Sequence, residues 1–270
     1  MTRFLSVLGI LSRRARTGFY LTIFFAFSLG SGLFFNAQFD LLDFKALQYD
    51  EGALDTAFAW RTQSPTNDPN RDSQLIMEHY FRDEVAEIDI ISAQTICYAG
   101  WTPEELFDFS QNLFDRHLAP KIYEDIARLH DALRQAGIDI KVISGSPQWT
   151  VEAACERLGI AKSDVYGARS VVTNGKLTGE MDPPITYKAG KVGAMQHWIG
   201  DQTATIAFGD SKSDYPMQER SMIRVAVNPR PGVRKYASEN EPETWRLWVP
   251  NKTKDGHTVE RIDTDRVITE

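Results

Sequence analysis

Apolar residues in the middle of the chain recur at helical spacing between Pro120 and Gly137. They are Ile122, Ile126, Leu129 and Leu133, which fall on one face of a helix. Proline is common in the first turn of a helix, and glycine is common just past the last turn. The pattern therefore predicts an amphipathic helix that Pro120 opens and Gly137 ends.

The pattern changes directly after Gly137. Residues 138–143 alternate in polarity and are mostly β-branched, which is typical of a strand. This strand leads into Ser144-Gly145-Ser146-Pro147. Pro147 then opens another helix, which Gly159 closes.

Strands and helices continue to alternate after Gly159. Asn174-Gly175 lies between two short strand-like runs and predicts a β-hairpin. The later pattern predicts a helix over 192–199, a strand over 203–208, a helix after Gly209-Asp210 and a last strand over 223–227. Such alternation is typical of an α/β fold with a mostly parallel sheet.

Helical spacing also recurs before Pro120, over residues 75–91 and 102–117. The second run begins with Thr102-Pro103-Glu104-Glu105, which has the N-cap residue, the proline and the acidic first turn of a helix start. We therefore expect a small helical insert ahead of the α/β core.

An uncharged run over residues 17–39 follows a cluster of arginines at 13–16. As a helix it would be about 34 Å long, enough to cross a bilayer, and Asn36-Ala37-Gln38 would suit the end of a secretory signal. The other interpretation is a buried strand within Phe19–Leu29, because continuous apolar runs are normal in parallel sheets. We expect a membrane-associated, periplasmic or exported protein, with a cytoplasmic one as the alternative.

The charge of the chain narrows the class of partner. A net charge of −7 argues against nucleic acid, because phosphate backbones are bound by dense Lys/Arg patches that this chain lacks. A small anionic ligand would have to be met by local charges or by a metal. The two cysteines, Cys97 and Cys155, are too few for a disulfide framework and are expected to be buried thiols.

Two carboxylates follow the predicted strand over 203–208. Asp210 comes at its tip, and Asp214 falls four residues later on the first turn of the next helix. Hard oxygen ligands of this kind suit Mg²⁺, which takes one or two carboxylates, several waters and a substrate phosphate oxygen. Each acid alone would instead be read as a helix cap or a first-turn acid.

Groups that suit an anion follow the predicted strand over 138–143. Ser144 offers a hydroxyl, and Gly145 offers a backbone N–H close to a helix start. Lys191 lies near the start of the next helix, where its ammonium group would neutralise phosphate charge. Ligands of open α/β sheets bind beyond the carboxyl ends of the strands, so these residues and the two acids are expected at one site.

At these positions the sequence resembles the haloacid dehalogenase-like hydrolase superfamily, in particular its phosphoserine phosphatase-like branch. The matching stretches are Val142-Ile143-Ser144-Gly145-Ser146, Ala189-Gly190-Lys191, Phe208-Gly209-Asp210-Ser211-Lys212-Ser213-Asp214 and Ala226-Val227-Asn228-Pro229. The resemblance implies a three-layer Rossmann-like core with an inserted helical cap. It implies Ser144 and Lys191 as phosphate ligands, and Asp210 and Asp214 as ligands of Mg²⁺.

The sequence departs from that family at the nucleophile. The family has an early strand that ends in Asp-x-Asp-x-Thr, and this chain has no Asp-x-Asp before Ser144. If residues 23–27 form the first strand, Ala26 and Ser28 stand where the two acids belong. Asp40 and Asp43 are the nearest substitutes, but their spacing of three turns one carboxylate away on a strand.

Three explanations of this departure stay open. The family mechanism runs with Asp40 or Asp43 reaching the site from a rearranged loop. Alternatively, the chain is an impaired relative that binds a phosphorylated ligand without turnover. A third possibility is an amino-terminal sequence altered relative to a working ancestor.

The sequence thus predicts four regions. They are a hydrophobic segment over 1–39, either an anchor or signal or the first core strand, a helical cap region over 40–119, an α/β core over 120–250 and a polar tail over 251–270. The expected function is Mg²⁺-dependent hydrolysis of a small phosphorylated metabolite. Residues 17–39 are the predicted site of any membrane association.

Overall fold

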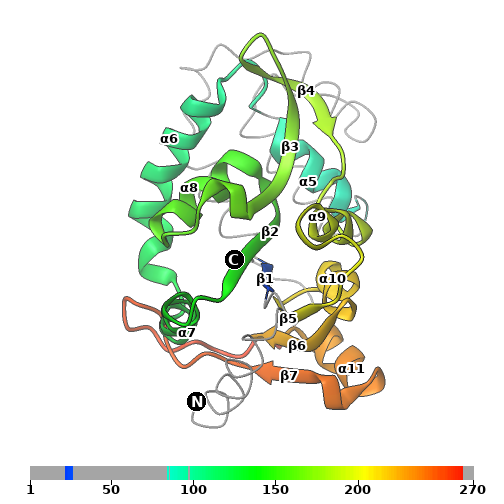
Figure 1. Cartoon of the computed structure of the whole chain (residues 1–270). Helices are drawn as coiled ribbons and strands as arrows, with labels where there is room; N and C mark the ends of the chain where they lie inside the picture. Colours follow the sequence, from blue (N-terminus) through cyan, green and yellow to red (C-terminus); the bar gives the residue numbers. More distant parts are fainter. Residues whose placement is uncertain (1–21, 27–83, 85, 97, 264–270) are drawn as a thin grey trace.

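Parallel strands form the centre of the molecule. The computed structural model describes residues 22–26, 84, 86–96 and 98–263 (Figure 1). Within these residues there is one seven-stranded sheet of order β4-β3-β2-β1-β5-β6-β7. The strands are β1 (Thr22–Ala26), β2 (Asp139–Pro147), β3 (Val165–Thr173), β4 (Lys176–Asp182), β5 (Ala204–Gly209), β6 (Ser221–Val227) and β7 (Trp245–Trp248). All neighbouring pairs are parallel except β3 and β4.

Strand β1 lies inside the segment whose nature the sequence left open. It pairs with β2 on one side and with β5 on the other, so residues 22–26 occupy the middle of the sheet. The remaining residues of the 17–39 run lie outside the described part of the chain. Among the described residues, no helix combines the length and the apolar character needed to cross a membrane.

Helices cover both faces of the sheet and complete three layers. They are α5 (Glu87–Ile96), α6 (Pro103–Leu113), α7 (Glu124–Gln135), α8 (Gln148–Arg157), α9 (Ala189–Ile199), α10 (Tyr215–Glu219) and α11 (Pro231–Glu239). Helices α7 and α8 bury Leu129, Leu133 and Val151 with residues of β2, β3, β5 and β6. On the other face, α9 and α10 bury Met195 and Met217 against β2, β3 and β5. The predicted α/β class is therefore confirmed.

A helical segment is inserted between two adjacent strands, because α5 and α6 fall between β1 and β2 in the chain. Thr102 caps α6 as predicted, with a reciprocal capping box to Glu105. The structure describes only the last part of the span expected over 75–91, where α5 runs from Glu87 to Ile96; residues 75–83 lie outside the described part. Buried Ile96 continues the apolar face of α5 beyond the predicted end.

The start of α7 corrects one prediction. Pro120 lies in a short 3₁₀ turn, Ala119–Lys121, and α7 begins only at Glu124. The residues between are extended because the C-terminal segment pairs with them: Tyr123 forms a bridge with Thr253, and Lys254 N–H donates to Ile122 O at 2.9 Å. The end of the helix is as predicted, since Gly137 has φ +69° and donates to Arg134 O.

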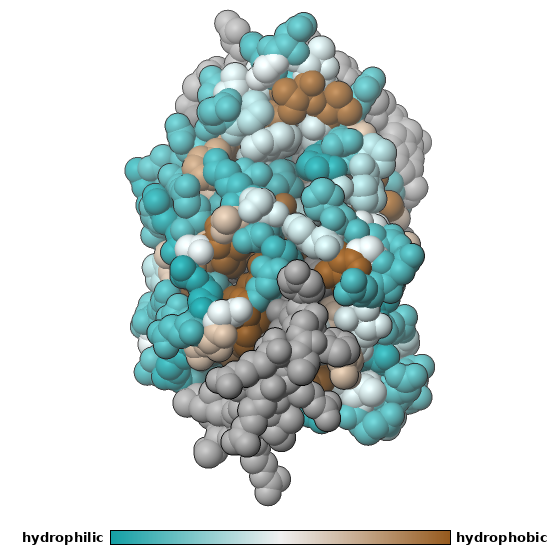
Figure 2. All heavy atoms as spheres, in the orientation of Figure 1, coloured by the Kyte–Doolittle hydropathy of each residue, from teal (hydrophilic) through white to brown (hydrophobic). Residues whose placement is uncertain are grey.

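The hairpin and the last strand give one confirmation and one correction. Asn174 and Gly175, with φ of 52° and 76°, connect β3 and β4 as a two-residue turn. Residues 223–227 fall within β6 but are not in the last strand, because β7 adds a further edge strand next to β6. Hydrophilic side chains dominate the face seen in Figure 2, with hydrophobic ones gathered in a few separate areas.

Candidate functional site

The predicted site lies at the carboxyl end of β1, between the neighbouring strands β2 and β5. Ala26 is in register with Ile143 of β2, and Phe25 is in register with Phe208 of β5. Ser144 and Asp210 therefore both come just beyond the end of β1, on opposite sides of it. A crevice at such a reversal of strand order is the usual ligand site of an open parallel sheet.

A buried ion pair connects two of the predicted site residues. The Lys191 ammonium contacts Asp214 Oδ1, with side-chain exposures of 7% and 1%. Charges taken this far from water are retained only when they are paired and hydrogen-bonded, and breaking such a pair costs about 3–5 kcal/mol. The structure thus joins the start of α9 to the turn after β5.

The second oxygen of Asp214 holds the turn that carries Asp210. Asp214 Oδ2 accepts the N–H of Asp210 at 3.0 Å, the N–H of Ser211 at 3.1 Å and the Ser211 hydroxyl at 3.2 Å. Gly209 permits this approach, because a Cβ there would lie 2.6 Å from Asp214 Cβ. Asp214 therefore fixes the backbone from which the Asp210 carboxylate projects.

Ser144 lies on the other side of β1 and is 1% exposed. Its hydroxyl oxygen accepts the N–H of Ser146 at 3.1 Å, and the Thr186 hydroxyl donates to its carbonyl. Gly145 has α5 close by, since a Cβ there would be 3.1 Å from Ile91 Cδ1. Helix α5 and the loop before α9 thus enclose β2 at Ser144 and Gly145.

The loop before α9 connects Ser144 to Lys191. Thr186 holds the Ser144 carbonyl, and the neighbouring Ile185 carbonyl lies against Gly190 so closely that a Cβ there would be 1.7 Å from it. Only glycine allows this contact, which sets the first turn of α9 and therefore the position of Lys191. A continuous chain of contacts runs from Ser144 through this loop to Lys191, Asp214 and Asp210.

Sequence reasoning missed Glu87, the first residue of α5. Burial raises the pKa of its carboxyl group; the charge of Asp214 acts in the same direction, while Lys191, Arg230 and Lys188 lower it. These partners place a third carboxylate within electrostatic reach of the buried ion pair. Its sequence position gave no signal, because an acid in the first turn of a helix normally serves the helix dipole.

The nucleophile position differs from the other site positions. Strand β1 ends at Ala26, which has no ionisable group. Asp40 and Asp43, the predicted substitutes, lie outside the described residues, and so does Ser28. Their roles stay predictions.

The donor set suits a hard divalent cation. Asp214 Oδ2 is fully occupied by its three hydrogen bonds, whereas Oδ1 accepts only from Lys191 among the described contacts, and a carboxylate oxygen can accept about two. Asp214 thus has remaining capacity on Oδ1, beside Lys191. Within the described part of the chain, no three His, Cys, Asp or Glu residues gather as a metal cage, and Mg²⁺ does not need one, since it keeps waters and a substrate oxygen.

Comparison with protein families gives one extended match. The haloacid dehalogenase-like hydrolase family matches residues 43–219, which is more than half of the chain. The matched region contains Ser144, Lys191, Asp210 and Asp214. It begins after β1.

Similar curated proteins include two phosphatases. A phosphoserine phosphatase from Halobacterium salinarum is 30% identical over 125 residues, covering 43% of this chain and 59% of that protein. A histidinol-phosphatase from Neisseria meningitidis serogroup C is 26% identical over 149 residues, covering 52% of this chain and 66% of that protein. The chain thus spans about two thirds or less of these relatives.

A solved structure supports the fold. A protein of unknown function from Bordetella pertussis Tohama I matches with a TM-score of 0.61 and 19% identity, covering 84% of this chain and 97% of that one. At this identity the likeness concerns the fold alone.

Proposed function

Because this chain belongs to the haloacid dehalogenase-like hydrolase family, we propose that it is a Mg²⁺-dependent phosphomonoester hydrolase. Its substrate would be a small phosphorylated metabolite, in keeping with the two phosphatases it resembles. The observation that carries this proposal is the buried Lys191–Asp214 pair, linked by contacts to Ser144 and Asp210 beyond the carboxyl end of β1.

Each residue has a defined task in this proposal. The Ser144 hydroxyl and the N–H of Gly145 donate to the phosphoryl oxygens, and Lys191 neutralises part of their charge. Asp210, with Asp214 through Oδ1, would hold Mg²⁺, which supplies charge neutralisation when bound. Positioning and charge stabilisation are the main contributions in phosphoryl transfer, so this half of the site serves catalysis directly.

The attacking group remains the predicted Asp40 or Asp43. A carboxylate oxygen would bond to phosphorus as the ester P–O bond breaks, and the other carboxyl would protonate the leaving oxygen. Water would then cleave the acyl phosphate to carboxylate and inorganic phosphate. The end of β1 at Ala26 favours the second candidate function, binding of a phosphorylated ligand without turnover.

Substitution of Asp210 tests hydrolysis. We expect the full chain to release phosphate from an aryl phosphate only with Mg²⁺, and Asp210→Asn to lower the rate by about two orders of magnitude or more, because several kcal/mol of transition-state stabilisation depend on the metal. The matched control is Asp201→Asn, whose side chain is 94% exposed. Its rate should equal that of the unsubstituted protein.

The outcomes separate the two candidate functions. No release above a blank at saturating Mg²⁺ excludes the hydrolase. If phosphate and Mg²⁺ together still raise the melting temperature, and Asp210→Asn removes that rise, the chain is a binding protein. If no phosphate is released and the melting temperature is also unchanged, both candidate functions are excluded.

A further inference from the structure

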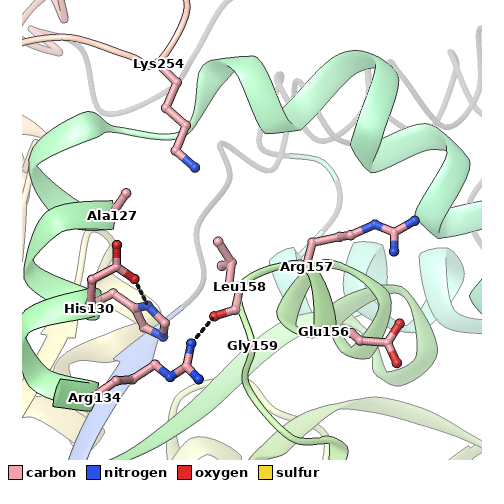
Figure 3. A pocket seen from close by; sticks show the side chains of 9 residues that line it. Ala127, His130, Arg134, Glu156, Arg157, Leu158, Gly159 and Lys254 are labelled. Atoms are coloured by element: carbon pink, nitrogen blue, oxygen red, sulfur yellow. Dashed lines mark hydrogen bonds and ion pairs between the residues drawn. The ribbon is translucent and has the colours of Figure 1, made fainter.

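A cavity of about 400 Å³ lies between α7, the C-terminal end of α8 and the C-terminal segment at Lys254 (Figure 3). It is distinct from the site described above. Helix α8 begins at Gln148, directly after β2, and its ten residues rise about 15 Å before they reach this cavity. Neither the family nor the proposed hydrolysis assigns a role to it.

Two cations of the cavity have no carboxylate partner among the described residues. Arg134 donates one hydrogen bond, from Nη1 to the carbonyl of Leu158 at 3.3 Å, which leaves most of its five N–H donors available. The ammonium of Lys254 makes no ion pair with any residue that the structure describes. Arg157, on the same rim, differs because Asp115 binds it through two oxygens.

A buried histidine lies beside these two cations. The side chain of His130 is 9% exposed, and within the described part of the protein its Nε2 has no hydrogen-bond partner. Its Nδ1 lies 3.6 Å from Asp131 Oδ1. Figure 3 shows the imidazole ring beside the Arg134 guanidinium, with the Lys254 ammonium across the opening. A buried polar atom without a partner is costly unless a ligand or water satisfies it.

The two acids of the cavity, Asp131 and Glu156, form no ion pair with these two cations among the described contacts. Asp131 is 68% exposed, so solvent screens it. Glu156 accepts a hydrogen bond from the side-chain amide of Gln111, on α6. Arg134 and Lys254 are therefore left as cations without an acidic partner in the described part of the chain.

We propose that this cavity binds a small oxyanion, a phosphate or carboxylate group held between Arg134 and Lys254, beside the His130 ring. The volume is within the range of small-molecule sites, roughly 300–1,000 Å³. A guanidinium group matches the geometry of both oxyanions, and the ammonium adds a point charge. The ligand is a second anion, separate from any phosphate at Ser144 and Lys191.

Proton NMR of the histidine rings tests this site without interference from the other one. The His130 signal is assigned by its loss in His130→Gln, and inorganic phosphate is titrated into the full chain at constant ionic strength with chloride. We expect a saturable shift of the His130 signal. In Lys254→Gln the midpoint should rise about fivefold, the effect of losing roughly 1 kcal/mol of partly exposed charge interaction.

The matched control is Lys252→Gln, which removes the same charge two residues away. Lys252 pairs with Glu124 at 3.1 Å and does not line the cavity, so its midpoint should equal that of the unsubstituted protein. A parallel titration with citrate distinguishes a carboxylate ligand from a phosphate ligand. The proposal is overturned if neither anion moves the His130 signal saturably, or if Lys254→Gln and Lys252→Gln give the same midpoint.

Discussion

Buried ionisable side chains of this protein are accommodated in two different ways. Lys191 and Asp214 are both charged and nearly inaccessible, and each satisfies the other, with backbone N–H groups on the second carboxylate oxygen. His130 is buried with one unpartnered nitrogen among the described contacts. The first arrangement fixes a site, while the second makes the folded state sensitive to pH.

Stability should fall below neutral pH because of His130. Burial lowers the pKa of its imidazole below the ordinary 6.5, Arg134 and Lys254 lower it further, and Asp131 opposes them. The unfolded chain therefore binds a proton at a higher pH than the folded chain. Stability is fully present above about pH 6.5 and is lost as the pH falls toward the folded-state pKa.

Urea denaturation between about pH 7.5 and pH 5.5 measures this loss. His130→Gln should weaken the pH dependence over that window. His197→Gln, at an exposed side chain without an ion pair among the described residues, should leave it unchanged. Equal pH dependence in the unsubstituted protein and His130→Gln would contradict the assignment.

At the scale of elements, tertiary contacts explain why two helices begin at other residues than the sequence pattern predicts. Helix α7 starts four residues after Pro120 because the C-terminal segment pairs with the residues between. Helix α9 starts at Ala189, where the preceding loop contacts Gly190. The second boundary bears on function, since Lys191 lies in that first turn.

Gly190→Ala should destabilise the protein and displace Lys191. The new Cβ would fall 1.7 Å from the Ile185 carbonyl oxygen, so the loop or the helix must shift at a cost of roughly 1–3 kcal/mol or more. We expect a lower urea midpoint and weaker phosphate binding.

Gly193→Ala, on the same helix, is the control. Among the described residues its Cβ would meet only Pro184 Cγ and Cβ, at 3.3 and 3.4 Å, and alanine favours a helix over glycine by about 1 kcal/mol. It should be near neutral. If both variants behave alike, the close approach at Gly190 does not position the helix.

For the whole molecule, the central strand is the feature on which the site depends. Strand β1 joins β2 and β5, which otherwise share no pairing, and the site lies at its carboxyl end. The inserted helices α5 and α6 separate β1 from β2 in the chain. The two halves of the sheet, and with them Ser144 and Asp210, are therefore brought together by five residues near the amino terminus.

Proline at the middle of β1 should disrupt the fold. Phe24 pairs with Lys141 on one side and with Ala207 on the other, and proline removes a backbone donor from a central strand. Phe24→Pro should lose a large part of the typical 5–15 kcal/mol of stability. Circular dichroism during urea denaturation measures this loss.

Thr22→Pro is the matched control for the central strand. Thr22 begins the strand and pairs only with Asp139, a position where proline is tolerated. Cooperative unfolding should persist in this variant. A Phe24→Pro protein as stable as Thr22→Pro would show that β1 is not needed to hold the sheet together.

The sequence by itself determined the features that depend on near neighbours. The α/β class, the hairpin at Asn174-Gly175, the Thr102 cap and the placement of Asp210 directly after a strand follow from period, turn chemistry and caps. These signals extend over a few residues, so they are present in the sequence before the chain folds. The strand expected to end before Ser144 continues to Pro147 because Pro147 pairs with Ala168 of β3.

Only the tertiary structure decided the features that require distant residues to meet. It placed 22–26 at the centre of the sheet, paired Lys191 with Asp214, set Glu87 beside them and enclosed a cavity with Lys254. A short apolar strand has the same local pattern as part of a membrane helix, and a first-turn acid resembles any other. Their roles depend on which long-range contacts the folded chain makes, and no local pattern carries that information.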